Sequence, residues 1–188
     1  MTTRLVVTLA ALLLACSQAP VKTQSGTTTS QPAPATIASF MVSSPAFADE
    51  EPIPARYSGK DTNYSPPLNW YGVPERTKSF VLIVEDPDAP MGTFTHWVAY
   101  NIPGKTKRLD ENLPKDEILP DGMRQLKNDA GRIGWFGPLP PPGKVHHYIF
   151  SVYALDQELN PVGDKIFLLK AMEGHILGQG RLTGTYKS

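Results

Sequence analysis

The chain has 188 residues, and its 18 basic and 18 acidic side chains give a formal net charge of zero. This balance leaves no basic stripe of the kind that a nucleic-acid partner would need. The 19 prolines and 15 glycines are scattered among apolar runs, as is typical of a loop-rich β protein rather than a helix bundle. The only cysteine is Cys16, so no disulfide can form within the chain and the fold has to rely on its apolar core.

The first 15 residues have the pattern of an export signal. Arg4 is followed by an apolar run over residues 5–15, which is shorter than the roughly 20 residues of a bilayer-spanning helix. The end of the run, Leu13-Leu14-Ala15-Cys16, resembles the lipobox of bacterial lipoproteins, in which the cysteine receives a diacylglycerol. We therefore expect a signal peptide over residues 1–15 and a lipid anchor on Cys16. The alternative is an ordinary signal peptide followed by a chance cysteine.

The next segment, up to residue 36, is dominated by Ser, Thr, Gln, Pro and Ala. It cannot bury enough surface to order itself, so we predict a lipid-anchored flexible tether over residues 16–36. The resemblance to lipoproteins implies an extracytoplasmic location at the cell envelope, attached to the membrane through the lipid. Ser17 is compatible with the outer membrane if the cell is Gram-negative. The remaining residues, 37–188, have the size of one domain.

Apolar segments of this domain predict its strands. The unbroken run over residues 80–84 predicts a strand that is buried on both faces. Residues 96–102 predict the next strand, and shorter ones are expected at 37–42 and 181–186. Residues 145–155 form the clearest strand, in which period two puts His146 and Tyr148 on one face and His147 on the other.

One helix and two loops complete the prediction. Four apolar residues at helical spacing predict a helix over residues 164–177, with Gly178 as its C-terminal stop: Ile166, Leu169, Met172 and Ile176. Residues 104–134 are polar and irregular and predict a long functional loop, and the prolines of residues 137–143 predict a rigid one. The predicted fold is mainly β, an antiparallel β-sandwich with a few peripheral helices.

Polar side chains cluster where the predicted strands end. Asp86 and Asp88 follow the buried run, His96 opens the next strand, and His146 and Tyr148 share one face of the long strand. If these strands are neighbours, the groups converge on a site for phosphate or another anion, with imidazolium and phenol as donors and the carboxylate fixing the tautomers. Each also has a purely structural interpretation, since Asp-Pro-Asp commonly forms turns and a lone strand histidine commonly has no ligand.

Several kinds of site have no matching motif in the sequence. No Gly-x-Ser-x-Gly, His-Glu-x-x-His or Walker-type phosphate loop is present. Asp86 and Asp88 begin like a calcium loop, but Pro90 and Met91 stand where that loop needs an oxygen ligand and a glycine. We therefore expect no metal and no cofactor.

Two ordered blocks resemble the signatures of the phosphatidylethanolamine-binding (Raf kinase inhibitor-like) proteins, and the likeness extends over nearly all of residues 38–187. The first block is residues 82–90 with 95–103, and the second is residues 137–143 with 146–156. The resemblance implies a β-sandwich with a small surface pocket for phosphate, acetate or phospholipid-headgroup anions. It also implies a cis peptide bond, at Asp86-Pro87 or among the prolines of residues 138–142.

The resemblance assigns the ligand-binding residues by motif position. It implies that four side chains hold the ligand, namely Asp86, His96, His146 and Tyr148. Four further residues are expected to shape the pocket wall, namely Asp88, Pro90, Gly137 and Pro138. The chain departs from the bacterial relatives at Leu139, where a cysteine is common, and at His147, where arginine is usual.

These observations predict a protein that binds a small anion or a phospholipid headgroup at the cell envelope and catalyses no reaction. One alternative is an inhibitor or regulator of a protease or other envelope protein, whose identity the sequence does not give. Another is a weak phosphoester hydrolase that uses Asp86 and His146 as acid–base partners.

Overall fold

The computed structural model of the chain describes residues 36–188. The predicted signal peptide, the lipidation site Cys16 and the predicted tether up to residue 35 lie outside the described residues. The boundaries of these segments therefore stay predictions.

Ten strands, one 3-10 turn and one α-helix follow one another along residues 36–188. The helical elements are η1 (Ala55–Tyr57) and α1 (Lys165–Met172). The strands are β1 (Ala38–Ser39), β2 (Met41–Ser43), β3 (Glu51–Pro52), β4 (Leu68–Tyr71), β5 (Ser79–Asp86), β6 (Phe94–Pro103), β7 (Arg108–Leu109), β8 (Arg124–Gln125), β9 (His146–Leu155) and β10 (Ile176–Tyr186).

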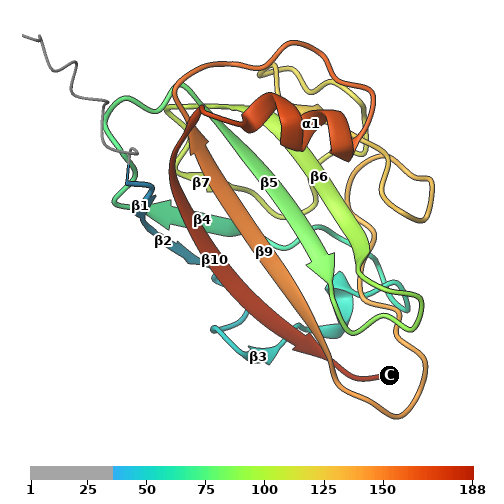
Figure 1. Cartoon of the computed structure of the whole chain (residues 1–188). Helices are drawn as coiled ribbons and strands as arrows, with labels where there is room; N and C mark the ends of the chain where they lie inside the picture. Colours follow the sequence, from blue (N-terminus) through green and yellow to red (C-terminus); the bar gives the residue numbers. More distant parts are fainter. Residues whose placement is uncertain (1–35) are drawn as a thin grey trace, which may run out of the picture. The chain divides into compact units, whose positions relative to one another are not determined.

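The strands form two sheets (Figure 1). The larger sheet has the order β1-β10-β9-β5-β6-β8, with β3 also paired to β10, and the smaller one has the order β2-β4-β7. Neighbouring strands are antiparallel, apart from β1 and β3, which each run parallel to β10. The predicted antiparallel β-sandwich is confirmed. The loop predicted over residues 104–134 contains the short strands β7 and β8.

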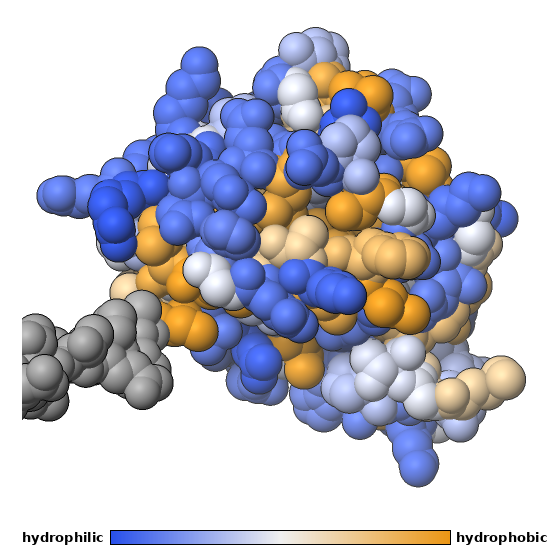
Figure 2. Space-filling view, turned by 45° about the horizontal axis from the view of Figure 1, so that its top comes forward, coloured by the Kyte–Doolittle hydropathy of each residue, from blue (hydrophilic) through white to orange (hydrophobic). Residues whose placement is uncertain are grey.

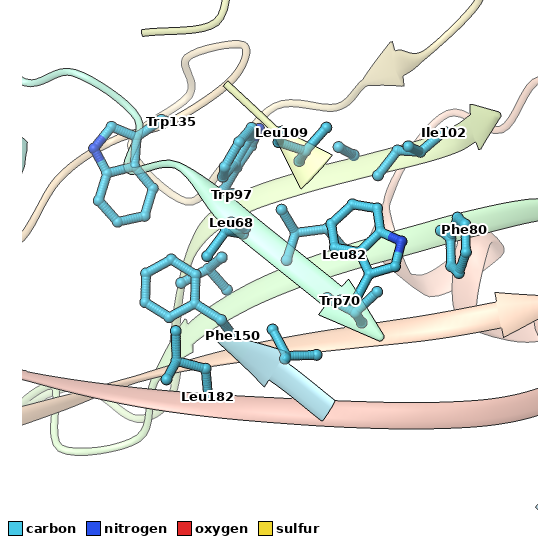
Figure 3. Packing of buried hydrophobic residues seen from close by; sticks show 14 of the residues in the cluster. Leu68, Trp70, Phe80, Leu82, Trp97, Ile102, Leu109, Trp135, Phe150 and Leu182 are labelled. Carbon is cyan, nitrogen blue, oxygen red and sulfur yellow. The ribbon is translucent and has the colours of Figure 1, made fainter. Parts of the chain in front are cut away.

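Large apolar side chains fill the space between the two sheets (Figure 3). Trp70 of β4 packs against Phe80 of β5, with ring centroids 5.1 Å apart, and Trp135 stacks on Phe150 of β9 at 5.8 Å. Burying several aromatic rings in one layer supplies much of the hydrophobic driving force of such a fold.

The other face of the larger sheet is covered in part by α1. Leu168 and Met172 of the helix are buried in a second apolar cluster together with Val81 and Ile83 of β5. Strand β5 is therefore buried on both faces, as its unbroken apolar run predicts.

The predicted helix over residues 164–177 is too long. Helix α1 ends at Met172, because Gly174 adopts a left-handed φ of 79° and Ile176 already pairs with Leu155 of β9. Of the four apolar residues that the spacing selects, only Met172 is buried, and the other buried residue of the helix is Leu168.

The single strand predicted over residues 37–42 is wrong as well, because the chain passes from one sheet to the other at Phe40. Strand β1 belongs to the larger sheet and β2 to the smaller one. A side chain at Gly180 would meet the carbonyl oxygen of Phe40 at 2.5 Å, so this crossing depends on a residue without a Cβ. Ala38 pairs with Gly178, which in turn pairs with Ala154, so the described chain begins beside the end of β9 that lies away from His146.

Three further features concern the surface and the backbone of the described residues. Helix α1 exposes Ile166, Phe167 and Leu169, and Figure 2, which brings the top of Figure 1 forward, shows apolar surface set among a largely hydrophilic one. Within residues 36–188, no helix has the length and apolar character to cross a membrane. No peptide bond in this part of the chain is cis, so the expected cis proline is not found.

Candidate functional site

The predicted site residues meet because of the strand order. Strand β5 is antiparallel to both β6 and β9, so its last residues lie beside the first residues of the other two strands. Asp86 pairs with Phe94 of β6, and Glu85 pairs with Ile149 of β9. Side chains that are far apart in the sequence are thereby gathered at one end of the larger sheet.

Asp86 and His146 form a buried pair at this end. The Nδ1–H of His146 donates to Oδ2 of Asp86 at 2.8 Å, and both side chains are only 4% exposed. The other carboxylate oxygen, Oδ1, accepts the backbone N–H of Asp88 at 2.8 Å. Both oxygens of Asp86 are therefore engaged, and the carboxylate fixes the orientation of the imidazole.

Tyr148 lies two residues further along β9 and is fully buried. Its hydroxyl lies near the carboxylate of Asp86 but has no partner at hydrogen-bond distance among the described residues, and both oxygens of that carboxylate already accept shorter bonds. Burial, and then the negative charge of Asp86, raise the pKa of Tyr148 well above its ordinary value, so the hydroxyl keeps its proton. An unpartnered buried hydroxyl costs about 1–3 kcal/mol, so this group is a candidate donor to a bound ligand or a water.

His96 differs from the imidazolium donor that the sequence suggested. Its Nδ1 lies 2.6 Å from the carbonyl oxygen of Phe136, and because a carbonyl only accepts, Nδ1 carries the proton. Burial lowers the pKa of His96 below its ordinary value of 6.5. The ring is therefore neutral near pH 7, and its Nε2 atom is an acceptor. It packs edge-on against Tyr148, with centroids 5.0 Å apart.

These groups surround a hollow of ≈ 160 Å³, which is smaller than the roughly 300–1,000 Å³ of sites for drug-sized ligands. Five of the predicted site residues line it, namely Asp86, Pro90, His96, His146 and Tyr148. The other lining residues are apolar and form a collar, namely Ala89, Phe94, Phe136, Leu139, Pro140 and Pro141. The hollow therefore combines a few polar atoms with largely apolar walls.

Three predicted site residues do not line the hollow. Asp88 accepts hydrogen bonds from the backbone and the ring of His147, at 2.9 and 2.7 Å, and this pair is about half exposed. Gly137 donates its N–H to Oδ1 of Asn63 at 2.8 Å, and the carbonyl oxygen of Pro138 accepts the N–H of Gly59 at 2.9 Å. These contacts hold the loop that carries Phe136 and Leu139, so Gly137 and Pro138 shape the wall indirectly.

Most residues of the apolar collar were not predicted from the sequence. Phe94 lies two residues before His96, so strand alternation would have placed the two on one face. Residues 137–143 were expected to form a rigid loop, but nothing in their sequence shows which side faces the site. The position of Phe136 depends on the loop alone, and no periodic signal could have revealed it.

Among residues 36–188, no three His, Cys, Asp or Glu side chains are placed to share a metal ion. Of the groups that line the hollow, His96 pairs with the carbonyl oxygen of Phe136, and His146 pairs with the carboxylate of Asp86.

Residues 43–187, most of the chain, match the family described as phosphatidylethanolamine-binding protein. The chain belongs to this family. The resemblance drawn from the two sequence blocks is thereby confirmed. A relative from Methanothermobacter thermautotrophicus, named UPF0098 protein, is 50% identical over 144 residues, which are 76% of this chain and 95% of the relative.

Two solved structures of the phosphatidylethanolamine-binding protein family have the same fold. CT736 from Chlamydia trachomatis, described as a candidate homologue of the family, gives a TM-score of 0.73 at 39% identity and covers 80% of this chain and 98% of that one. YbcL from E. coli, described as a new member of the mammalian family, gives a TM-score of 0.73 at 34% identity, with 79% and 98% covered.

One relative bears on the location of the protein. A protein from Mycobacterium tuberculosis, named as a candidate lipoprotein, LppC, is 38% identical over 160 residues, which are 83% of this chain and 76% of the relative. The name of at least one relative therefore describes a lipid-anchored protein.

Proposed function

We propose that the domain binds a small oxyanion, such as phosphate or the phosphate group of a lipid headgroup, and catalyses no reaction. The single observation that carries the proposal is the buried, unpartnered hydroxyl of Tyr148 beside the hollow. Such a group is stabilised when a ligand oxygen accepts its hydrogen bond. The family name, phosphatidylethanolamine-binding protein, supports a phosphate-bearing ligand.

The apolar collar adds a second property of the ligand. Phe94, Phe136 and the segment of residues 139–141 offer contact surface but no hydrogen bonds to a ligand side group. We infer that the oxyanion carries a short apolar substituent, as in an ester of phosphate, because burying such a group against the collar is favourable. The hollow itself is large enough for the anionic head and only a few further atoms.

The pairing of Asp86 with His146 is of a kind that acid–base catalysis also uses. A hydrolase acting through a covalent intermediate would in addition need a nucleophile beside this pair, and the residues that line the hollow include no Ser, Thr, Cys or Lys. The arrangement therefore supports binding better than turnover. A screen with generic phosphoesters that gave turnover abolished in His146→Ala would contradict this part of the proposal.

Calorimetric titration of the full chain with phosphate and with phosphoethanolamine tests the binding function. We expect binding that weakens about tenfold or more in His146→Ala, since loss of one charge-assisted hydrogen bond costs about 1.5–3 kcal/mol. His147→Ala is the matched control, because this neighbouring histidine pairs with Asp88 outside the hollow, and it should bind like the original chain. No heat with either compound, under conditions where the protein is folded, would refute the proposal.

We further propose that the protein acts at the cell envelope, held by a lipid on Cys16. The pattern of residues 1–16 and the lipoprotein relative support this location. Cys16→Ser should move the protein from the membrane fraction to the soluble fraction, whereas Ser17→Ala should leave it with the membrane. If both variants fractionate like the original chain, the anchor is not on Cys16.

A further inference from the structure

The hydrogen bonds around the hollow fix where its protons are. Both oxygens of Asp86 already accept hydrogen bonds, from His146 and from the backbone of Asp88. The Nδ1–H of His96 is given to the carbonyl oxygen of Phe136. A ligand is therefore left with three polar atoms, namely Nε2 of His96, Nε2 of His146 and the hydroxyl of Tyr148, none of which has a hydrogen-bond partner among the described residues.

Of these three atoms, Nε2 of His96 is the one whose role as an acceptor the structure fixes. Because Nδ1 holds the proton and burial keeps the ring neutral, Nε2 presents a lone pair to the ligand. An ionised ligand oxygen placed against that lone pair would bring two hydrogen-bond acceptors face to face, with no proton between them. A ligand oxygen that carries its own proton would instead donate to Nε2, and the contact becomes a hydrogen bond.

The charges around the site also favour a ligand with one negative charge over a ligand with two. No lysine or arginine lines the hollow. The nearby ionisable groups are Asp86 at the end of β5, His146 at the start of β9, Asp129 after β8, Tyr186 at the end of β10, the Asp88–His147 pair outside, and Arg132, whose guanidinium lies 5.6 Å from the ring centroid of Phe136. A protonated His146 would only balance Asp86. A doubly charged ligand would thus add two negative charges to a site without net positive charge.

We propose that the hollow selects a singly ionised oxyacid that retains one acidic proton, such as the monoanion of a phosphate ester or a phosphonate, and that this proton is donated to Nε2 of His96. The ionised oxygens of the same ligand accept from the hydroxyl of Tyr148 and, when it is protonated, from Nε2 of His146. This inference rests on the proposed oxyanion-binding function and adds the protonation state of the ligand.

The test compares two probes of equal charge, of which only one carries an acidic proton. Methylphosphonate as its monoanion and methanesulfonate have the same charge and nearly the same shape, but only the phosphonate keeps an O–H group. In calorimetric titration of the full chain, methylphosphonate should bind at least about tenfold more tightly than methanesulfonate, because one such hydrogen bond contributes about this factor to the affinity. As the pH rises and the phosphonate loses its last proton, as followed by its phosphorus NMR shift, its affinity should fall by about the same factor.

Other outcomes would overturn the inference in distinguishable ways. Equal affinity for the two probes would show that the ligand proton is irrelevant. Affinities for both probes that fall together with rising pH would assign the effect to the histidines of the protein. If neither probe, nor phosphate, bound at any pH, the oxyanion-binding function itself would fail.

A variant supplies an independent readout. His96→Gln places an amide, which both donates and accepts, where the imidazole presents only a lone pair. The preference for methylphosphonate over methanesulfonate should then shrink to about threefold or less, while His147→Gln should keep the full preference. Retention of the full preference in His96→Gln would exclude His96 as the proton acceptor. The comparison of probes on the unmodified chain stands even if the variant does not fold.

Discussion

Nδ1 of His146 lies 2.8 Å from Oδ2 of Asp86, and one residue further along β9, Nδ1 of His147 lies 2.7 Å from Oδ2 of Asp88. The two pairs join the same two segments with nearly the same geometry. They differ in burial, because the side chains of the first pair are 4% exposed and those of the second pair are 44% and 41% exposed. The molecule thus contains its own comparison between a buried and an exposed histidine–aspartate pair.

Double-mutant cycles on these pairs should give different coupling energies. For Asp86→Asn with His146→Gln we expect a coupling of about 1–3 kcal/mol, because each single variant strands a buried polar group. For Asp88→Asn with His147→Gln we expect less than about 1 kcal/mol, since water screens the exposed pair. Urea unfolding at neutral pH measures both cycles. Equal couplings would show that burial does not strengthen the first pair.

Tyr148→Phe should separate stability from binding. The hydroxyl has no partner among the described residues, so its removal loses no internal hydrogen bond, and the free energy of unfolding should stay within about 0.5 kcal/mol or rise. Oxyanion binding should weaken about 3- to 10-fold, because one donor is lost. Tyr153→Phe, on the other face of β9, is the control and should leave binding unchanged. A clear loss of stability in Tyr148→Phe would reveal an internal partner for the hydroxyl.

Acid should destabilise the protein through His96. Its folded pKa is lowered by burial, so below about pH 6.5 the unfolded chain binds a proton that the folded state does not, and stability falls as the pH falls. The slope contributed by this one group reaches at most about 1.4 kcal/mol per pH unit. Protonation of Asp88 does not contribute between about pH 7 and 5. The hydrogen bond from His147 lowers the pKa of this carboxyl, so that it is protonated only below about pH 4.

His96→Phe tests the origin of this slope. The variant should be less stable at neutral pH, because the carbonyl of Phe136 loses its donor, but its stability should depend less on pH across the same range. An unchanged pH dependence would assign the acid sensitivity to other groups.

Gly137→Ala should be strongly destabilising. A Cβ at this position would overlap the carbonyl oxygen of Tyr57 and meet the backbone carbon of Ser58 at 2.8 Å, and backbone atoms cannot move aside as a side-chain end can. We expect a loss of about 1–3 kcal/mol or more, together with weaker binding as the loop carrying Phe136 shifts. Gly163→Ala is the control, because no atom lies within 4 Å of its Cβ position. Thermal unfolding measures the stability of both variants. Equal losses of stability in the two would show that crowding at Gly137 is not the cause.

The central strands could be predicted because their signals are local. The apolar run of β5 and the alternation of β9 are written directly in residues 80–84 and 145–155, and the polar residues that end these strands mark the site. Asp86, His96, His146 and Tyr148 could therefore be proposed before any coordinates were known.

Other features depend on contacts that no sequence period reveals. The helix prediction extended into β10 because Ile176 continues the helical spacing, while glycines interrupt the alternation of that strand. Those glycines are needed because β10 is crowded, as at Gly184, where a Cβ would meet Ile53 at 2.5 Å. The proton position on His96 is set by the carbonyl oxygen of Phe136, which the loop brings in from 40 residues away.

The pairing of β1 with the first residues of β10 sets the place where the described chain enters the domain. Those residues of β10 pair in turn with the last residues of β9, whereas the hollow lies at the first residues of β9. The ten residues of β9 span about 30 Å. The described chain therefore enters the domain by the end of the larger sheet opposite the hollow, and residues 36 and 37, which lead into β1, stand about one strand length from the site.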